Sequence, residues 1–121
     1  MLVTVAIEIG DDEGPAISET QTIVYTDAVP AVGSDADAPV PNAEWEGEVA
    51  TDTVRLFRFS ALTFNGHRIH YDEAYTTGEE SYRGLVVHGP LTAILLAEMA
   101  RARGIAGRAF HFHGRTPPVC G

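Results

Sequence analysis

Two polar residues five positions apart, Asn65 and His70, carry the clearest chemical signal in the sequence, within FNGHRIHYD. A histidine titrates near neutral pH and can take and return a proton, whereas an asparagine amide can hold a water molecule or a hydroxyl group. The turn between them contains Gly66, so both side chains can point into one cavity. One interpretation is a proton-transfer site. The other is a turn asparagine beside a structural histidine, and residue types alone favour this second interpretation.

The helix expected from Pro90 onward favours the first interpretation, a proton-transfer site. Proline suits the first helical turn, where its missing N–H costs nothing, and free N–H groups at a buried helix start stabilise negative charge. Gly89 has no side chain to block an approaching carbonyl oxygen. A thioester oxygen there would be stabilised as it gains charge, and one such donor lowers a barrier by about 3 kcal/mol. The sequence thus offers a base, a polar positioner and an oxyanion site.

The histidines at 67, 70, 111 and 113 raise a metal site as an alternative, through His-x-x-His and His-x-His spacing. Catalytic zinc needs three protein ligands, and no third ligand or flanking carboxylate stands at a suitable spacing. We therefore expect no metal. His67 is equally compatible with a turn residue hydrogen-bonded to backbone, and His111 and His113 are expected on one face of a strand.

The elements that must position these residues follow from hydrophobic patterning. Strands are predicted at Leu2–Ile9 and Gln21–Thr26, as an antiparallel pair joined through a turn at 10–15. Residues 28–42, rich in Ala, Pro and Asp, predict an exposed linker. The near-continuous apolar run Val54–Leu62 predicts a third strand with little solvent exposure.

The second half is expected to contain helices and one more strand. A short helix is predicted around 72–75, and a long one over Pro90–Arg103. This long helix is apolar on nearly every side, so it should be enclosed by other elements rather than laid on a surface. Arg108–Arg115 alternates Phe110 and Phe112 with smaller and polar residues, which predicts a fourth strand.

Composition excludes several classes of function. The chain has 121 residues and a net charge of −9; all eight basic residues are Arg, and none lies in the first 54 positions. The acidic half argues against a nucleic-acid partner. Cys120 is the single cysteine, which excludes a disulfide framework. No apolar run reaches the roughly 18 residues of a membrane span, and the acidic start does not suit a signal peptide. A reducing cytosol is the expected compartment.

Two runs, RFSALTFNGHRIHYD and RGLVVHGPLTAILL, resemble the MaoC-like hot-dog hydratases and dehydratases. The similarity is specific across residues 54–103 and points to the branch of type 2 3-hydroxyacyl-thioester dehydratases and mesaconyl-C4-CoA hydratases. The family signature places an aspartate five residues before a catalytic histidine. Asn65 occupies that aspartate position here, which leaves His70 as the only strong base and Asn65 as water positioner.

The resemblance also implies a fold, a site and a substrate. The fold is α+β, with an antiparallel hot-dog sheet wrapped around one long central helix. The implied catalytic residues are Asn65, His70 and Gly89, and the implied substrate-binding residues are Arg68, Tyr71 and His88. The implied reaction is reversible hydration of a trans-2-enoyl thioester. Coenzyme A or acyl carrier protein would be the substrate's carrier, with no metal or redox cofactor.

The same resemblance implies a domain organisation. Residues 1–27 look like the last strands of a first hot-dog unit, 28–50 like a linker, and 51–121 like a catalytic unit without its final strands. We therefore expect a fragment whose unpaired strand edges pair with the missing strands or with a second copy, as a homodimer.

Two other functions stay open. A hot-dog thioesterase would hydrolyse the thioester, although such enzymes rely on a carboxylate near the helix and none closely precedes Gly89. A truncated, non-catalytic hot-dog module would bind acyl groups or dimerise without turnover.

Overall fold

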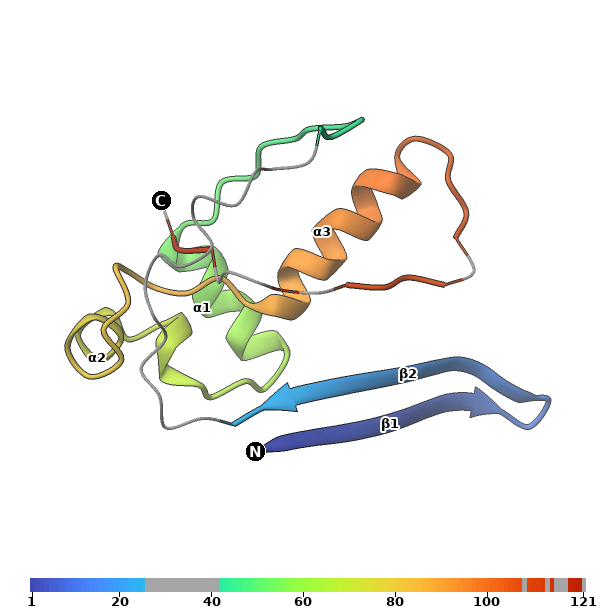
Figure 1. The fold of residues 1–121 in the computed structure, drawn as a ribbon, viewed down its shortest axis with the longest axis horizontal. Helices are drawn as coiled ribbons and strands as arrows, with labels where there is room; N and C mark the ends of the chain where they lie inside the picture. Colours follow the sequence, from blue (N-terminus) through green and yellow to red (C-terminus); the bar gives the residue numbers. More distant parts are fainter. Residues whose placement is uncertain (26–41, 108, 113, 115–117, 121) are drawn as a thin grey trace. The chain divides into compact units, whose positions relative to one another are not determined.

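A computed structural model describes residues 1–25, 42–107, 109–112, 114 and 118–120 of the chain (Figure 1). The chain divides into two compact units, Met1–Pro30 and Ala31–Gly121. The first contains an antiparallel pair of strands and the second contains the helices. The predicted α+β class is therefore confirmed. The predicted linker at 28–42 lies almost wholly outside the described residues.

A β-hairpin forms the first unit. Strand β1 (Leu2–Asp11) pairs antiparallel with strand β2 (Gly14–Val24). Side chains alternate between the two faces of a strand, and this register places most of the larger apolar residues of both strands on one face, with Leu2 and Val24 on the other. The first of these faces carries Val3, Val5, Ile7, Ile9, Ile17 and Ile23. The predicted antiparallel pair is confirmed, although β2 begins at Gly14 rather than at Gln21; Thr26, the predicted end, lies outside the described residues.

Glycines make the hairpin turn possible. A Cβ at position 10 would lie 2.3 Å from the carbonyl oxygen of Gly14, so only glycine fits where the register shifts after Ile9. Gly14 itself has a φ of +132°, a conformation that other residues rarely adopt. The side chain of Asp11 accepts a hydrogen bond of 2.9 Å from the backbone N–H of Glu13. The turn chemistry therefore fixes the register of the strands.

The predicted third strand over Val54–Leu62 is wrong. These residues belong to helix α1 (Thr53–Leu62). Asp52 caps the helix by accepting a hydrogen bond of 2.7 Å from the Arg55 N–H. The buried residues of α1 are Leu56 and Ser60, four positions apart, as on one helical face. The run looks continuously apolar in the sequence because apolar residues also occupy exposed positions of the helix. Phe57 and Leu62 are 60% and 79% exposed.

The end of α1 turns the chain toward the candidate site. The Asn65 N–H bonds to the Ser60 carbonyl at 2.9 Å, and the Phe64 N–H bonds to the Ala61 carbonyl at 3.4 Å. This pair of bonds is a Schellman motif, which requires a left-handed residue after the helix. Phe64 takes that conformation, with a φ of 54°, although glycine usually does so. A strained phenylalanine thus directly precedes Asn65.

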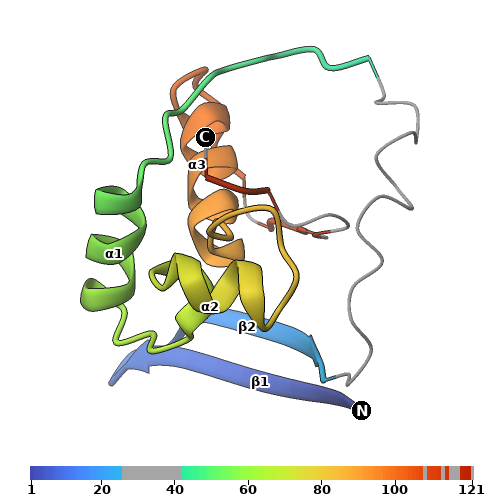
Figure 2. The ribbon, with the colours of Figure 1, turned by 90° about the vertical axis from the view of Figure 1, so that its left-hand side faces the viewer.

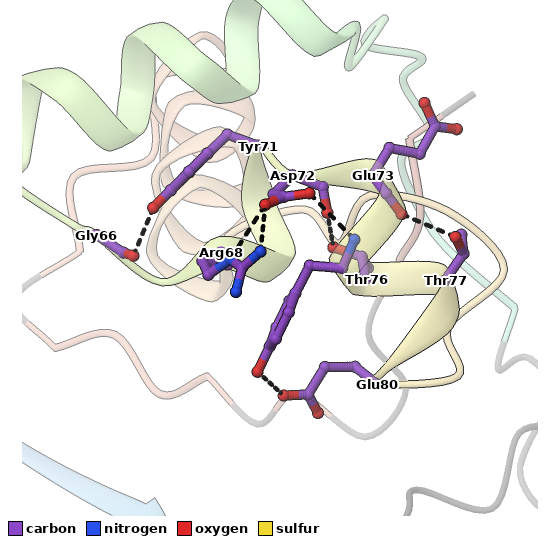
Figure 3. A network of polar contacts seen from close by, with 9 residues as sticks. Gly66, Arg68, Tyr71, Asp72, Glu73, Thr76, Thr77 and Glu80 are labelled. Atoms are coloured by element: carbon purple, nitrogen blue, oxygen red, sulfur yellow. Dashed lines mark hydrogen bonds and ion pairs between the residues drawn. The ribbon is translucent and has the colours of Figure 1, made fainter.

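Two short elements follow this turn. The 3-10 helix η1 (Arg68–His70) precedes α2 (Glu73–Gly78), which confirms the predicted short helix with a longer extent. Asp72 caps α2 by accepting a hydrogen bond of 3.0 Å from the Tyr75 N–H (Figure 3). Residues 85–87 then run antiparallel to 118–120, through the Val86–Val119 bridge.

Helix α3 (Gly89–Arg101) confirms the predicted helix and its start, but not its enclosure by a sheet. Only Leu91 of this helix is buried, and Ile94 is 52% exposed. Helices α1 and α3 lie beside one another in Figure 2, and a small core joins them. That core consists of Leu56, Leu85, Val87 and Leu91, with Phe59, Leu95 and Cys120 packed against it.

The predicted fourth strand is not found among residues 109–112 and 114. The remaining positions of that prediction (108, 113 and 115) lie outside the described residues. The rings of Phe110 and Phe112 stack at 6.5 Å, on one side of this segment. No helix in the described part of the chain has the length and hydrophobicity that crossing a bilayer demands.

Candidate active site

The imidazole of His70 is held by one peptide carbonyl. His70 ends η1, is only 7% exposed, and its Nδ1 lies 2.8 Å from the carbonyl oxygen of Val86. A carbonyl oxygen only accepts hydrogen bonds, so Nδ1 must carry the proton and donate. In the neutral ring, Nε2 then keeps an unprotonated lone pair. This is the tautomer that a proton acceptor needs.

Backbone pairing holds the Val86 peptide in place. Its N–H donates to the Ile69 carbonyl at 2.9 Å, so one residue holds both the backbone before His70 and the ring of His70. On either side, the Val87 N–H donates to Pro118 at 2.8 Å, and the Cys120 N–H donates to Leu85 at 2.7 Å. The position of the His70 imidazole therefore depends on the short pairing between 85–87 and 118–120.

His88 lies directly against His70. The two rings stack with their centroids 3.8 Å apart and an interplanar angle of 17°. His88 is fully buried, and its Nε2 lies 2.8 Å from the hydroxyl oxygen of Ser60. The ring of Phe59 meets it edge-on at 4.7 Å. Within the described residues, Nδ1 of His88 has no hydrogen-bond partner, and such a buried orphan costs about 1–3 kcal/mol.

Burial keeps both imidazoles neutral at pH 7. The pKa of His88 is lowered to about 4, first by burial and then by the nearby His70. The pKa of His70 is also lowered, first by burial and then by His67, while the Val86 carbonyl opposes this change by favouring the charged ring. His70 is therefore available as a base and His88 does not compete with it as a cation.

Asn65 lines a shallow groove that His70 does not line. Its Oδ1 accepts a hydrogen bond of 3.0 Å from the backbone N–H of His67, which fixes the side-chain amide in an Asx turn. The Nδ2 group remains as a donor. The groove has a volume of about 310 Å³ and is lined by Phe57, Ser60, Ala61, Phe64, Asn65, Gly66 and Tyr71. His70 is not among these residues.

Tyr71 shares this groove with Asn65. Its hydroxyl donates a hydrogen bond of 2.8 Å to the carbonyl of Gly66 (Figure 3). Gly66 lies in the turn that follows Asn65, so this bond ties the Tyr71 ring to that turn. The predicted substrate-binding role of Tyr71 stays a prediction.

Gly89 is the first residue of α3 and is exposed. A Cβ added there would meet no heavy atom of the described chain within 4 Å. The preceding His88 makes no side-chain cap, and Pro90 has no N–H of its own. The helix start thus presents the Gly89 N–H without a side chain in front of it. Because the ring of His70 stacks on His88, the residue before Gly89, the His70 imidazole and this helix start lie in the same region.

Arg68 makes structural contacts. Its guanidinium forms an ion pair of 2.7 Å with Asp72, and it lies 4.0 Å from the ring centroid of Tyr75 (Figure 3). The hydrogen bond to Asp72 raises the pKa of Arg68 and lowers that of Asp72. These contacts bring the side chain toward α2, so a substrate would have to compete with Asp72 for it.

The histidines do not assemble a metal centre in the part of the chain that the structure describes. No three His, Cys, Asp or Glu side chains there are placed to hold one ion. The rings of His67 and His70 meet nearly perpendicular, with centroids 5.5 Å apart. His113, expected on a strand face, lies outside the described residues.

Sequence reasoning missed Ser60. This residue lay inside the run interpreted as a strand, and its contact with His88 spans 28 positions. Its polar character between Phe59 and Ala61, four positions from the buried Leu56, is the signal that could have found it once the run is treated as a helix.

Comparison with known proteins gives consistent results. Mesaconyl-C(4)-CoA hydratase of Chloroflexus aurantiacus is 49% identical over 121 residues, which covers 95% of this chain and 42% of that protein. The mitochondrial hydroxyacyl-thioester dehydratase type 2 of Schizosaccharomyces pombe is 41% identical over 64 residues, covering 52% of this chain and 20% of that protein. The chain therefore spans less than half the length of these relatives. The family model described as hydroxyacyl-thioester dehydratase type 2 matches residues 1–118, and the chain belongs to this family.

Proposed function

We propose that this chain carries the hydro-lyase chemistry of an enzyme that reversibly hydrates a trans-2-enoyl thioester. The observation that carries the proposal is the hydrogen bond between Nδ1 of His70 and the Val86 carbonyl. It leaves a neutral imidazole with its Nε2 lone pair available to a substrate proton. The relatives named as a hydratase and a dehydratase support the same class of reaction.

The proposed roles are assigned to His70, Asn65 and Gly89. His70 removes a proton from water as the hydroxyl adds to the β-carbon, and it then returns a proton to the α-carbon. Asn65 holds the water or the 3-hydroxyl group through Nδ2, because its Oδ1 is engaged by His67. The Gly89 N–H, aided by the α3 dipole, stabilises the thioester oxygen as it becomes enolate-like. The reverse sequence dehydrates the (R)-3-hydroxyacyl thioester.

Substrate contacts are proposed from the residues around this region. Tyr71 borders the groove beside Asn65, and His88 backs the ring of His70. Arg68 would meet the substrate only after exchanging its contact with Asp72. The acyl group would be carried by coenzyme A or acyl carrier protein as part of the substrate. All the proposed steps use side chains and one peptide N–H, with no metal or redox cofactor.

Replacing His70 tests the proposal. His70→Ala should reduce hydration of crotonyl-CoA or mesaconyl-C4-CoA about 10²- to 10⁴-fold, as expected for loss of a general base. The measurement is the decrease in enoyl-thioester absorbance, with free thiol titrated in the same reaction. His111→Ala removes an exposed histidine outside the site and should retain the parent rate.

Three results would contradict the proposal. They are an inactive parent chain, a His70→Ala variant as fast as the parent, and thiol release that accounts for all substrate loss. The last result would identify a thioesterase.

A further inference from the structure

The hydrogen bond of His70 fixes its tautomer but does not by itself fix the plane of its ring. The bond from Nδ1 to the Val86 carbonyl decides which nitrogen carries the proton, and it leaves the tilt of the ring to the side chains packed against it. A base also needs its lone pair directed at one point, because small misplacements reduce the rate strongly. The contacts on the face of the ring therefore matter.

His88 provides a flat surface against that face. The near-parallel stack at 3.8 Å restricts movement of the His70 ring out of its plane. This restriction is effective only if the ring of His88 is itself held in place. Its ring is fully buried, and Phe59 contacts it edge-on at 4.7 Å.

Ser60 fixes the remaining rotation of His88. A buried ring can turn about its Cβ–Cγ bond unless a directional contact holds it. The 2.8 Å contact between the Ser60 hydroxyl and Nε2 is such a contact, and Ser60 is itself only 5% exposed on α1. The orientation of His88 is thereby tied to two elements, the start of α3 and the inner face of α1.

The choice of histidine at position 88 is informative because a plain aromatic ring would stack equally well. Nδ1 of His88 is buried without a partner in the described residues, which is unfavourable for stability. Phenylalanine would avoid that cost but would lose the contact with Ser60. The imidazole at position 88 is therefore explained by the directional bond to Ser60, not by packing.

We infer that Ser60 and His88 form a positioning pair that holds the imidazole of His70 in the orientation required for proton transfer. This inference rests on the proposed function for its catalytic meaning. Its structural content is measurable without turnover: if the His70 ring loses its orientation, its bond from Nδ1 to the Val86 carbonyl weakens and its tautomer ratio shifts.

Ser60→Ala tests the pair by nitrogen NMR of the histidine rings in the full chain. The parent should show His70 with its proton on Nδ1. In the variant, the ratio of the two His70 tautomers should shift about fivefold toward that of the exposed His111, the change expected when one hydrogen bond is lost. If hydration is active, kcat should fall about fivefold while KM stays within about twofold.

Two further variants sharpen the test. His88→Phe keeps a stacking ring without the bond to Ser60, so it should shift the tautomer ratio as Ser60→Ala does, and the double variant should add little. Thr63→Val removes the hydroxyl of the residue that follows α1, which donates to the Phe59 carbonyl at 2.7 Å. This matched control should keep the parent ratio.

Unchanged His70 tautomers in both Ser60→Ala and His88→Phe would overturn the inference, as would an equal shift in Thr63→Val. If the parent chain fails to hydrate any enoyl-CoA, the proposed function fails. The NMR result still decides the positioning pair in that case.

Discussion

The buried His88 makes stability depend on pH in a defined direction. Its folded pKa of about 4 lies below the value of about 6.5 expected in the unfolded chain. Between these values the unfolded chain binds more protons, so the free energy of unfolding is highest above pH 6.5 and falls toward pH 4. His70, whose pKa is also lowered by burial, contributes with the same sign.

Urea unfolding at a series of pH values measures this dependence. The midpoint for the parent should decrease as the pH falls from 6.5 to 4. The slope for His88→Phe should be shallower because one titrating group is removed. Equal slopes for parent and variant would show that His88 does not titrate in the way its burial requires.

Residue types were sufficient to propose His70 as a base, but not to predict what holds it. The sequence also places His88 next to the helix start. Nothing in the sequence pairs His70 with the Val86 carbonyl or His88 with Ser60, because these contacts span 16 and 28 positions. Such pairings depend on how α1 packs against 85–87, which only the fold determines.

At the scale of elements, the end of α1 contains a strained residue. Phe64 adopts a left-handed φ of 54° and is 96% exposed, so its side chain gains little from packing in return. A left-handed conformation costs a residue with a Cβ about 1–2 kcal/mol. Phe64→Gly should therefore raise the free energy of unfolding by about 1 kcal/mol.

Phe64→Ala serves as the control for this change. Alanine removes the aromatic ring but keeps the Cβ, so its stability should match the parent within about 0.5 kcal/mol. Chemical denaturation of the three proteins gives the comparison. If Phe64→Ala raised the free energy of unfolding as much as Phe64→Gly does, the effect would come from the exposed ring and not from the backbone.

Element boundaries show what sequence patterns can and cannot determine. The helix beginning at Gly89-Pro90 and the antiparallel hairpin were predictable, because proline at a helix start and turn residues between β-branched runs act locally. Helix α1 was predicted as a strand because its apolar residues look continuous. The Asp52 cap and the spacing of Leu56 and Ser60 were the competing local signals.

At the scale of the whole molecule, the second unit depends on a small core. Leu56 is fully buried and belongs to a cluster of four buried residues, so few neighbours can move to fill a cavity. Leu56→Ala should lower the free energy of unfolding by about 2–5 kcal/mol. Leu62→Ala, on the same helix but at a position that is 79% exposed, should change it by less than about 0.5 kcal/mol.

Thermal and urea unfolding of the two leucine variants provide the measurement. If both variants lost the same free energy of unfolding, the core would not lie between α1 and α3. The contrast between the two leucines would also establish helix α1, because a strand alternates its faces and would place positions 56 and 62 on the same side.

Within the described residues, the hairpin β1–β2 has no buried core of its own comparable to that of the second unit. A two-stranded hairpin is marginal by itself in water, and one face of this hairpin gathers Val3, Val5, Ile7 and Ile9 of β1. The expected pairing with further strands or with a second copy remains a prediction. The physical reason for expecting this pairing is that an isolated hairpin is only marginally stable.

Val86 uses both of its main-chain polar groups, which belong to two successive peptide groups. Its N–H donates to the Ile69 carbonyl, and its carbonyl oxygen accepts from the ring of His70. A shift of the backbone at this one residue would therefore disturb the local fold and the orientation of the imidazole together. The constraint at position 86 lies in the main chain, even though the side chain there is an ordinary valine.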